Sequence, residues 1–292
     1  MTQTQAQPTT RTIDVPGAVL TYDVRRDDAS SEPPLMLIGS PMGAAGFGTL
    51  AGLFADRTIV TYDPRGSERS TKPDMTTVST PDEHADDVHR VIREVGGPVD
   101  LFGSSGGATN ALSLVAKHPE DVRTLVAHEP PIATLLPDRE NALAASRAVH
   151  ETYLRSGFGA GMAHFIALVS HTGEFPDGWA QQPGPDPSMF GMPTEDNGDR
   201  TDPLLGQAMI PGTHHELDLD ALRAAPARIV IAAGVESAGI MPSRAAYALA
   251  QQLGTEVVVF PSGHGGFLGG EYGQSGEPEA FAAKLREVLA SH

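Results

Sequence analysis

Short apolar runs alternate along the chain with longer amphipathic stretches. Two runs around Pro16-Gly17, at residues 12–15 and 19–24, alternate apolar and polar positions, which is typical of an antiparallel hairpin. Continuous apolar runs bounded by Pro, Gly or Asp are instead expected for strands that are buried on both faces. Such runs lie at residues 35–38, 58–62, 99–102, 124–127, 229–233 and 257–260.

Helix-like stretches fall between these apolar runs. They lie at residues 48–55, 81–95, 108–118, 241–253 and 278–290. A regular alternation of strand and helix predicts a mainly parallel sheet with helices on both faces. We therefore predict an α/β fold in which the N-terminal hairpin is an antiparallel addition to the sheet.

The alternation stops between Ile132 and Arg223. Helix-like segments at 138–157 and 161–171 are followed there by a tract rich in Pro and Gly at 173–211. An insertion of this size has to pack somewhere, and in open α/β sheets ligands bind at the carboxyl ends of the strands. We predict three parts, which are a disordered leader over residues 1–11, a core over residues 12–131 and 224–292, and a mostly helical cap over residues 132–223.

Composition narrows the classes of function. The chain has 292 residues, no cysteine and a formal net charge of -17 at pH 7. The lack of cysteine excludes disulfides, thiol nucleophiles and zinc–thiolate sites. The negative charge disfavours nucleic acids and anionic membranes as partners. No apolar run approaches the roughly 20 residues of a membrane-spanning helix, and no signal-peptide pattern is present. We expect a cytoplasmic protein that acts on a small molecule, and we leave a homodimer open.

A serine between two structural elements is the first candidate for chemistry. Residues 103–107 read Gly-Ser-Ser-Gly-Gly, directly after the apolar run at 99–102 and directly before a helix-like stretch. In a Gly-x-Ser-x-Gly turn the serine occupies a strained corner between strand and helix, and small neighbours let backbone pass close by. Free N–H groups at the helix N-terminus favour negative charge that develops there. The pattern predicts Ser105 as a nucleophile.

A nucleophilic serine needs a base, and histidine is the usual one. Among the 11 histidines, His264 lies in a glycine-rich loop just after the last predicted strand, where it can reach a serine hydroxyl. We interpret His84 and His89 as residues on the solvated face of a charged helix. The adjacent His214 and His215 lack a third ligand at a useful spacing, so we expect no metal.

Two glutamates compete for the acid that would orient the histidine. Glu129 follows the run at 124–127 and precedes Pro130-Pro131, and Glu236 follows the run at 229–233. Either carboxylate could accept the imidazole N–H, fix its tautomer and stabilise the imidazolium. The residues alone leave both assignments open.

Together, the serine turn, the insertion and the late histidine resemble the α/β-hydrolase superfamily over nearly the whole chain. Residues 62–70 are similar to its D-x-R-G-x-G-x-S loop, with Glu68 in place of the second glycine. Residues 103–108 followed by His128-Glu129-Pro130-Pro131 look most like the zearalenone lactonase group, whose triad acid is the glutamate of an H-E-x-P motif. The resemblance therefore favours Glu129 over Glu236.

An oxyanion hole is the remaining part that the resemblance implies. One donor is expected to be the N–H of Gly106, the residue after the nucleophile. The superfamily supplies the second from an H-G-x loop, where this chain reads Ser40-Pro41-Met42. Pro41 has no N–H, so we expect Met42 to be the second donor.

These residues predict a carboxylic ester hydrolase, either an esterase or a lactonase, that forms an acyl-enzyme on Ser105 and needs no cofactor. A hydrolase-fold ligand-binding protein with little turnover is one alternative, and an acyltransferase or carbon–carbon hydrolase with the same triad is another. Apolar residues of the cap are expected either to line a pocket for a small apolar substrate or to form the cap's own core. They are Phe158, Met162, Phe165, Ile166, Trp179, Met189, Phe190 and Met192.

Overall fold

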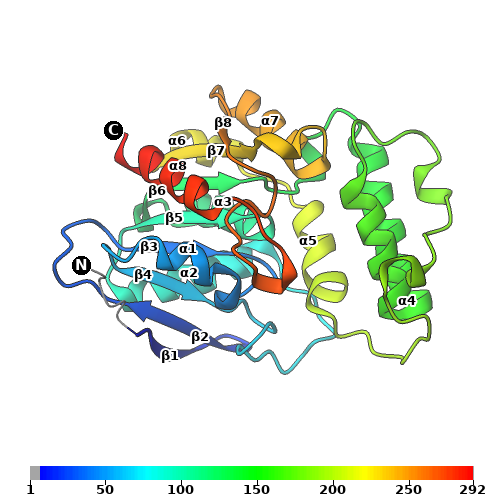
Figure 1. The fold of residues 1–292 in the computed structure, drawn as a ribbon, viewed down its shortest axis with the longest axis horizontal. Helices are drawn as coiled ribbons and strands as arrows, with labels where there is room; N and C mark the ends of the chain where they lie inside the picture. The colour runs from blue at the N-terminus through cyan, green and yellow to red at the C-terminus, as the bar shows by residue number, and fades with distance from the viewer. Residues whose placement is uncertain (1–6, 292) are drawn as a thin grey trace.

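An eight-stranded sheet forms the centre of the computed structural model, which describes residues 7–291. The strand order is β1-β2-β4-β3-β5-β6-β7-β8. The hairpin β1–β2 is antiparallel, β2 joins β4 antiparallel, and every other pair is parallel (Figure 1). The predicted sheet is confirmed. The strands are β1 (Thr9–Val15), β2 (Ala18–Arg25), β3 (Leu35–Ile38), β4 (Ile59–Tyr62), β5 (Val99–Ser104), β6 (Val122–His128), β7 (Arg228–Gly234) and β8 (Val258–Phe260).

Helices cover both faces of the sheet, as predicted. One apolar cluster packs α2, α3, α6 and α7 on one face, with Val88, Leu112 and Leu249 among its buried members. A second cluster packs α1 and α8 on the other face through Leu50 and Phe281. These helices are α1 (Gly48–Gly52), α2 (Pro81–Val95), α3 (Gly106–Lys117), α6 (Leu219–Ala224), α7 (Met241–Leu253) and α8 (Pro278–Ala290).

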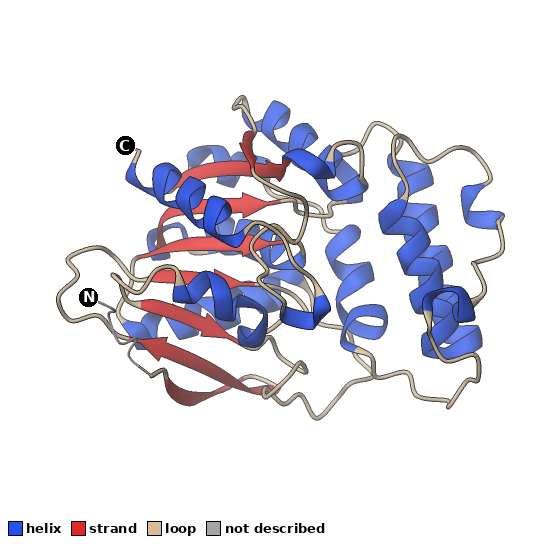
Figure 2. Ribbon diagram, in the orientation of Figure 1, coloured by secondary structure: helices blue, strands red, loops and turns tan. Residues whose placement is uncertain are grey.

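The insertion is mostly helical and lies beyond the carboxyl ends of the parallel strands, toward which their arrowheads point in Figure 2. Its helices are α4 (Arg139–Ser170) and α5 (Met209–Thr213), and α5 lies between α4 and the sheet in Figure 1. The two helical segments expected at 138–157 and 161–171 are the halves of α4, which is interrupted at Gly157, where φ is 85°. Short helical turns connect the other elements: η1 (Ala44–Phe47), η2 (Pro119–Asp121), η3 (Ala133–Leu135), η4 (Trp179–Gln181), η5 (Pro187–Phe190), η6 (Pro203–Ala208), η7 (Val235–Ser237) and η8 (Glu271–Gly273).

Two predicted boundaries need correction. The first strand begins at Thr9, within the expected leader, because Thr9 pairs with Val24 of β2. Residues 1–6 lie outside the described residues. Helix α6 begins within the range predicted for the cap, which ends at residue 223, but it packs against α3 and α7 of the core. Among residues 7–291, no helix has both the length and the apolar composition needed to cross a membrane.

The close packing of α3 against β3 yields a test of the fold. A Cβ atom at Gly107 would lie 2.4 Å from the carbonyl oxygen of Ile38 and 2.7 Å from the Cα of Gly39. Because β3 is fully buried and its backbone cannot move aside, we expect Gly107→Ala to lower the free energy of unfolding by about 1–3 kcal/mol. Urea unfolding measures the loss.

Gly212→Ala is the matched control for that substitution. A Cβ atom at Gly212, in helix α5, would meet no heavy atom within 4 Å. Alanine also favours a helix more than glycine does, so this variant should keep or gain stability. Equal losses in the two variants would contradict the packing that we describe.

Candidate active site

Ser105 stands at a sharp turn between the central strand β5 and helix α3. Its backbone has φ 56° and ψ -127°, a left-handed conformation that is uncommon for a residue with a side chain. The Ser105 N–H donates to the carbonyl oxygen of His128 at 2.9 Å, which ties the turn to the end of β6. The turn therefore has the strained geometry that the motif predicts, and it presents Ser105 at the carboxyl edge of the sheet.

The glycines of the turn are required by close backbone contacts. A Cβ atom at Gly103 would lie 2.8 Å from the carbonyl oxygen of Gly107, and one at Gly106 would lie 2.5 Å from that of Ser40. Real Cβ atoms do not approach so closely, so side chains at these positions would force the turn apart. The spacing of small residues around Ser105 follows from this packing.

Glu129 is fully buried at the end of β6, and it receives two hydrogen bonds. His264 Nδ1 lies 2.5 Å from its Oε2 atom, and the N–H of Gly234 donates to its Oε1 atom at 2.9 Å. Its own N–H donates to the carbonyl oxygen of Ala232 at 3.0 Å. The structure thus brings together the ends of β6 and β7 and the loop after β8 at one carboxylate.

This environment keeps the carboxylate charged. Burial raises the pKa of Glu129, but the hydrogen bonds from His264 and from the N–H of Gly234 act in the opposite direction, and the net pKa is lowered. An ionised carboxylate can only accept, so the proton of His264 lies on Nδ1 and the other ring nitrogen is left as an acceptor.

The competing acid lies elsewhere. Glu236 is exposed on η7, and its Oε2 atom accepts from the hydroxyl of Ser262 at 3.3 Å. The hydrogen bonds of the described residues therefore join His264 to Glu129 and leave Glu236 at the surface.

The loop at 62–70 braces the segment that follows β3. Asp63 accepts from the Ala44 N–H at 2.8 Å and from Arg69 Nε at 2.6 Å. A Cβ atom at Gly43 would lie 2.4 Å from the Asp63 carboxylate, so the two loops are in tight contact. Glu68, which replaces a glycine of the superfamily motif, adopts a positive φ of 50° and accepts from the hydroxyl of Tyr272 at 3.2 Å.

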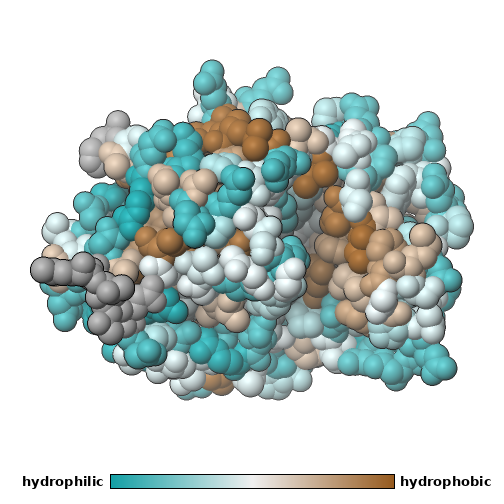
Figure 3. Space-filling model, viewed as in Figure 1, coloured by the Kyte–Doolittle hydropathy of each residue, from teal (hydrophilic) through white to brown (hydrophobic). Residues whose placement is uncertain are grey.

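Ser105 and His264 line a single cavity of about 360 Å³ between core and cap. Figure 3 shows a hollow between these two parts of the molecule, with hydrophobic side chains along it. The remaining lining is mostly apolar and consists of Ser40, Gly106, Pro131, Phe165, Leu168, Val169, Leu204, Ala208, Met209, Gly212, Thr213, Ile240, Met241, Pro242 and Gln274.

The prediction of cap residues for this pocket needs correction. Of the residues proposed, Phe165 lines the cavity. Met162 and Trp179 instead pack in an apolar cluster that joins the insertion to Met241 of α7, and the Trp179 ring stacks on His164 with centroids 5.3 Å apart. Met189 and Phe190 lie on the surface, 75% and 37% exposed. Ile166 and Met192 are half-buried but do not line the cavity with Ser105.

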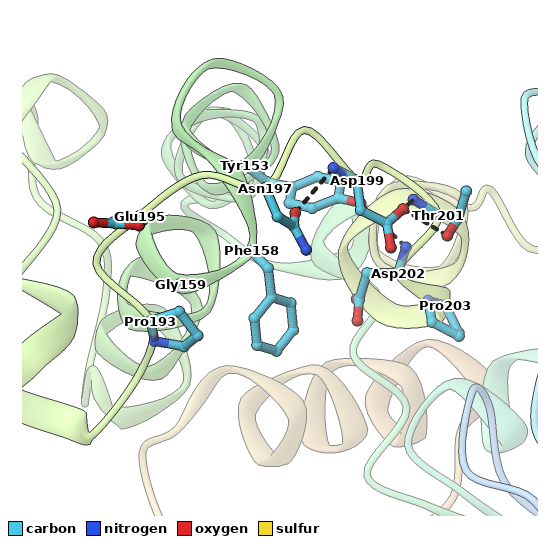
Figure 4. Close-up of a pocket in the computed structure, with 10 residues that line it drawn as sticks. All are labelled: Tyr153, Phe158, Gly159, Pro193, Glu195, Asn197, Asp199, Thr201, Asp202 and Pro203. Atoms are coloured by element: carbon cyan, nitrogen blue, oxygen red, sulfur yellow. Dashed lines mark hydrogen bonds between the residues drawn. The ribbon is translucent and has the colours of Figure 1, made fainter.

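Phe158 belongs to a different cavity. Figure 4 shows it at the centre of a space of about 330 Å³ in the cap, with Pro193 on one side and Asp202 on the other. Neither Ser105 nor His264 lines this space. Helical spacing alone therefore does not separate residues that line this space from residues that line the cavity with Ser105.

The sequence does not identify the residues between 204 and 213 that line the cavity with Ser105, because their Pro/Gly-rich tract shows no helical periodicity. The structure forms η6 and α5 there. The Asp202 carboxylate accepts from the N–H groups of Leu204 and Leu205 at 3.0 and 2.7 Å, and Pro203 follows it. An Asp-Pro pair is a recognised helix start, and it is the signal that could have located this segment.

Of the two residues expected to donate to the oxyanion, Gly106 lines the cavity with Ser105 and Met42 does not. Gly106 lines the cavity at the first position of α3, where an N–H has no partner within the helix. Met42 packs its side chain against the cluster under α1 and α8. The role of its N–H stays a prediction.

Other histidines are engaged in contacts of their own. The interpretation of His84 as solvated is wrong, because it is buried on the same face of α2 as Val88. His214 and His215 bind the hydroxyls of Ser146 and Ser113 at 2.9 and 2.8 Å.

One group among residues 7–291 could hold a metal ion. His89, His118 and Asp121 bring candidate ligand atoms within 4.8 Å of one another. His89 Nδ1 already lies 2.6 Å from the Asp121 carboxylate, and the two histidine rings stack with centroids 3.9 Å apart. None of the three lines the cavity with Ser105.

Comparisons with known proteins identify the family. Residues 35–284 match the alpha/beta hydrolase family. The chain is also 31% identical over 272 residues to the uncharacterized hydrolase YraK of Bacillus subtilis, which covers 88% of this chain and 89% of that protein. The chain therefore belongs to the α/β hydrolase family.

Solved structures share the fold at lower identity. A thermophilic esterase from Thermogutta terrifontis has a TM-score of 0.63 and 20% identity, covering 97% of this chain and 98% of its own. The structure of E-2-(acetamidomethylene)succinate hydrolase also has a TM-score of 0.63, with 21% identity and coverage of 98% and 100%. At 20% and 21% sequence identity, these similarities show a shared fold.

His128, directly before Glu129, is buried among aromatic rings beneath the site. Its ring centroid lies 6.0 Å from those of Phe102 and Phe260 and 5.3 Å from that of Phe281. Burial lowers the pKa of His128 to about 4, although the charge of Glu129 acts in the opposite direction. The folded protein therefore keeps this side chain neutral at pH values where an unfolded chain would protonate it.

This difference predicts a pH dependence of stability. His128 contributes stability above its unfolded pKa of 6.5, and that stability is lost as the pH falls toward about 4. One such group changes the free energy of unfolding by up to about 1.4 kcal/mol per pH unit. His128→Phe retains an aromatic ring but binds no proton. We expect it to reduce the slope of the free energy of unfolding against pH, between pH 6.5 and 4, by the amount that one bound proton contributes. Urea unfolding across this range measures the slope, and an unchanged slope would refute the prediction.

Proposed function

We propose that the protein is a serine hydrolase that cleaves an ester or a lactone of a small, apolar molecule. One observation carries the proposal: Ser105 shares a mostly apolar cavity with His264, whose Nδ1 lies 2.5 Å from the buried carboxylate of Glu129. This order of residues supports a Ser-His-Glu triad, in which the acid orients the base and the base activates the nucleophile.

The proposed reaction begins when Ser105 Oγ attacks the carbonyl carbon of the substrate. His264 takes the serine proton on Nε2, and the N–H groups of Gly106 and Met42 stabilise the oxyanion. The tetrahedral intermediate then collapses, the bond to the leaving oxygen breaks, and His264 returns the proton to that oxygen. Water, deprotonated by His264, then attacks the acyl carbon, the bond to Ser105 Oγ breaks, and His264 returns the proton to Ser105 Oγ as the acid is released.

The cavity supports an apolar substrate, because Phe165, Leu168 and Met209 line it beside Ser105. The likeness of residues 103–108 and 128–131 to the zearalenone lactonase group supports lactones as well as esters. Transfer of the acyl group to another acceptor would use the same residues, as would carbon–carbon bond cleavage. A protein that only bound its ligand would have no chemical need for the buried Glu129–His264 pair.

Labelling with a fluorophosphonate tests the proposed nucleophile. Wild type should acquire one adduct, detected by intact mass and mapped to Ser105, because an activated serine displaces the fluoride. Ser105→Ala should acquire none. A folded wild type that takes up no label, or takes it up at another residue, would count against the proposal.

The acid can be tested with a matched pair of variants. Glu129→Gln preserves size but loses the charge that stabilises the imidazolium, so we expect kcat for p-nitrophenyl butyrate to fall by about 10²–10⁴-fold. Glu236 is exposed, so Glu236→Gln should keep a kcat within a few-fold of the wild-type value. Both proteins are compared after urea unfolding shows similar stability. The reverse outcome, with Glu236→Gln inactive and Glu129→Gln active, would disprove this triad.

A further inference from the structure

A second, very small cavity adjoins the catalytic one. It has a volume of about 10 Å³, and Ser40, Gly106, Ala208 and Gly212 line both cavities. The rest of its wall comes from the start of α2, the middle of α3 and the cap: Ser79, Pro81, His84, Asn110 and Pro211. The cavity therefore lies where α2, α3 and the cap meet beside Gly106.

Three polar groups of this wall have no hydrogen-bond partner among the described residues. They are Ser79 Oγ, His84 Nδ1 and Asn110 Nδ2. The three residues are 4%, 7% and 3% exposed, so bulk water does not satisfy them. A buried polar group without a partner is costly, and native proteins have few of them. Three such groups around one cavity therefore call for a common ligand.

The wall of the small cavity is polar but uncharged. Burial, aided by the positive charges of Arg65 and Lys72, lowers the pKa of His84 to about 3, so its ring is neutral. Arg65 itself is neutralised by Asp87, to which it donates at 2.7 and 2.6 Å. None of the residues that line the cavity carries a charge that could pair with an ion, whereas a neutral oxygen would find donors and acceptors there.

Size and position define the ligand further. A space of this volume holds about one water-sized atom. Gly106 borders it, and the N–H of Gly106 is the proposed donor to the carbonyl oxygen of the substrate. His264, which must protonate the leaving group, does not line it. A group bound here would therefore belong to the acyl side of the scissile bond.

We propose that Ser79, His84 and Asn110 form a specificity subsite for a hydroxyl or keto oxygen on the acyl portion of the substrate. The inference rests on the proposed function and deepens it, because it names hydroxy-acyl or oxo-acyl esters and lactones as the substrate class. A site built to hydrogen-bond a substrate hydroxyl discriminates strongly against the analogue that lacks it.

The test compares p-nitrophenyl butyrate with its 2-hydroxy and 3-hydroxy derivatives. Wild type should prefer one hydroxy ester in kcat/KM by about tenfold or more, the effect of one satisfied buried hydrogen bond. Ser79→Ala and Asn110→Leu should each reduce that preference at least several-fold. Replacing an unpartnered polar group by an apolar one removes a desolvation cost, so both variants should fold, which circular dichroism verifies.

Thr109→Val is the matched control. Thr109 Oγ1 is also buried without a partner among the described residues, but Thr109 lines neither cavity. This variant should keep the wild-type preference. The inference is overturned if wild type does not prefer a hydroxy ester, or if Ser79→Ala, Asn110→Leu and Thr109→Val all keep the wild-type preference. The subsite would then hold ordered water only.

Failure of the proposed function can be told apart from failure of the subsite. If fluorophosphonate does not modify Ser105, the hydrolase proposal fails and the subsite proposal falls with it. If Ser105 is modified but no ester turns over, binding is compared instead of kcat/KM. The measurement is how strongly the hydroxy acids and butyrate each protect Ser105 from labelling. Equal protection by these acids in wild type would then overturn the subsite alone.

Discussion

The site depends on the buried contact between Glu129 and His264. A carboxylate without solvent is costly unless donors surround it, and here His264 Nδ1 and the Gly234 N–H supply them at 2.5 and 2.9 Å. These donors come from the loop after β8 and the end of β7. The contact forms because three neighbouring parallel strands, β6, β7 and β8, end at one edge of the sheet, so the site depends on the order of the strands.

The strained turn at Ser105 depends on the same sheet. Its positive φ is maintained by the bond to the His128 carbonyl oxygen and by the contact of Gly107 with β3. Both contacts use backbone atoms of neighbouring strands. Packing of the core thus supplies the energy that keeps the serine in an unfavourable conformation. The insertion and the start of α7 together supply the apolar wall of the cavity that Ser105 lines.

Much of this architecture could be predicted from sequence, because the core has strong local signals. The predicted ranges of α2, α7 and α8 agree with the structure, and Ser105 and His264, predicted from their motif and loop, line one cavity. The choice between Glu129 and Glu236 could not be made from the residues, since both follow strands. In the structure the path of a distant loop brings His264 to Glu129, whose backbone has φ 49°, and this contact supports Glu129 as the proposed acid.

The cap was the least predictable part. Phe158 and Phe165 lie on the same half of α4, after Gly157, yet they line different cavities, because different distant segments cover them. His84 was misjudged for another reason. It shares a helical face with Val88 and Val91, at spacings of four and seven residues, and this periodicity indicates burial.

Trapping the covalent intermediate tests the central claim most directly. Wild type and Ser105→Ala would be mixed with p-nitrophenyl butyrate, quenched in acid within the first turnover, and analysed by intact mass and peptide mapping. The account predicts one butyryl group on Ser105 of wild type, formed together with a burst of p-nitrophenol, and no acylation or burst in Ser105→Ala. Hydrolysis that proceeds without acylated Ser105, or at an equal rate in Ser105→Ala, would contradict it.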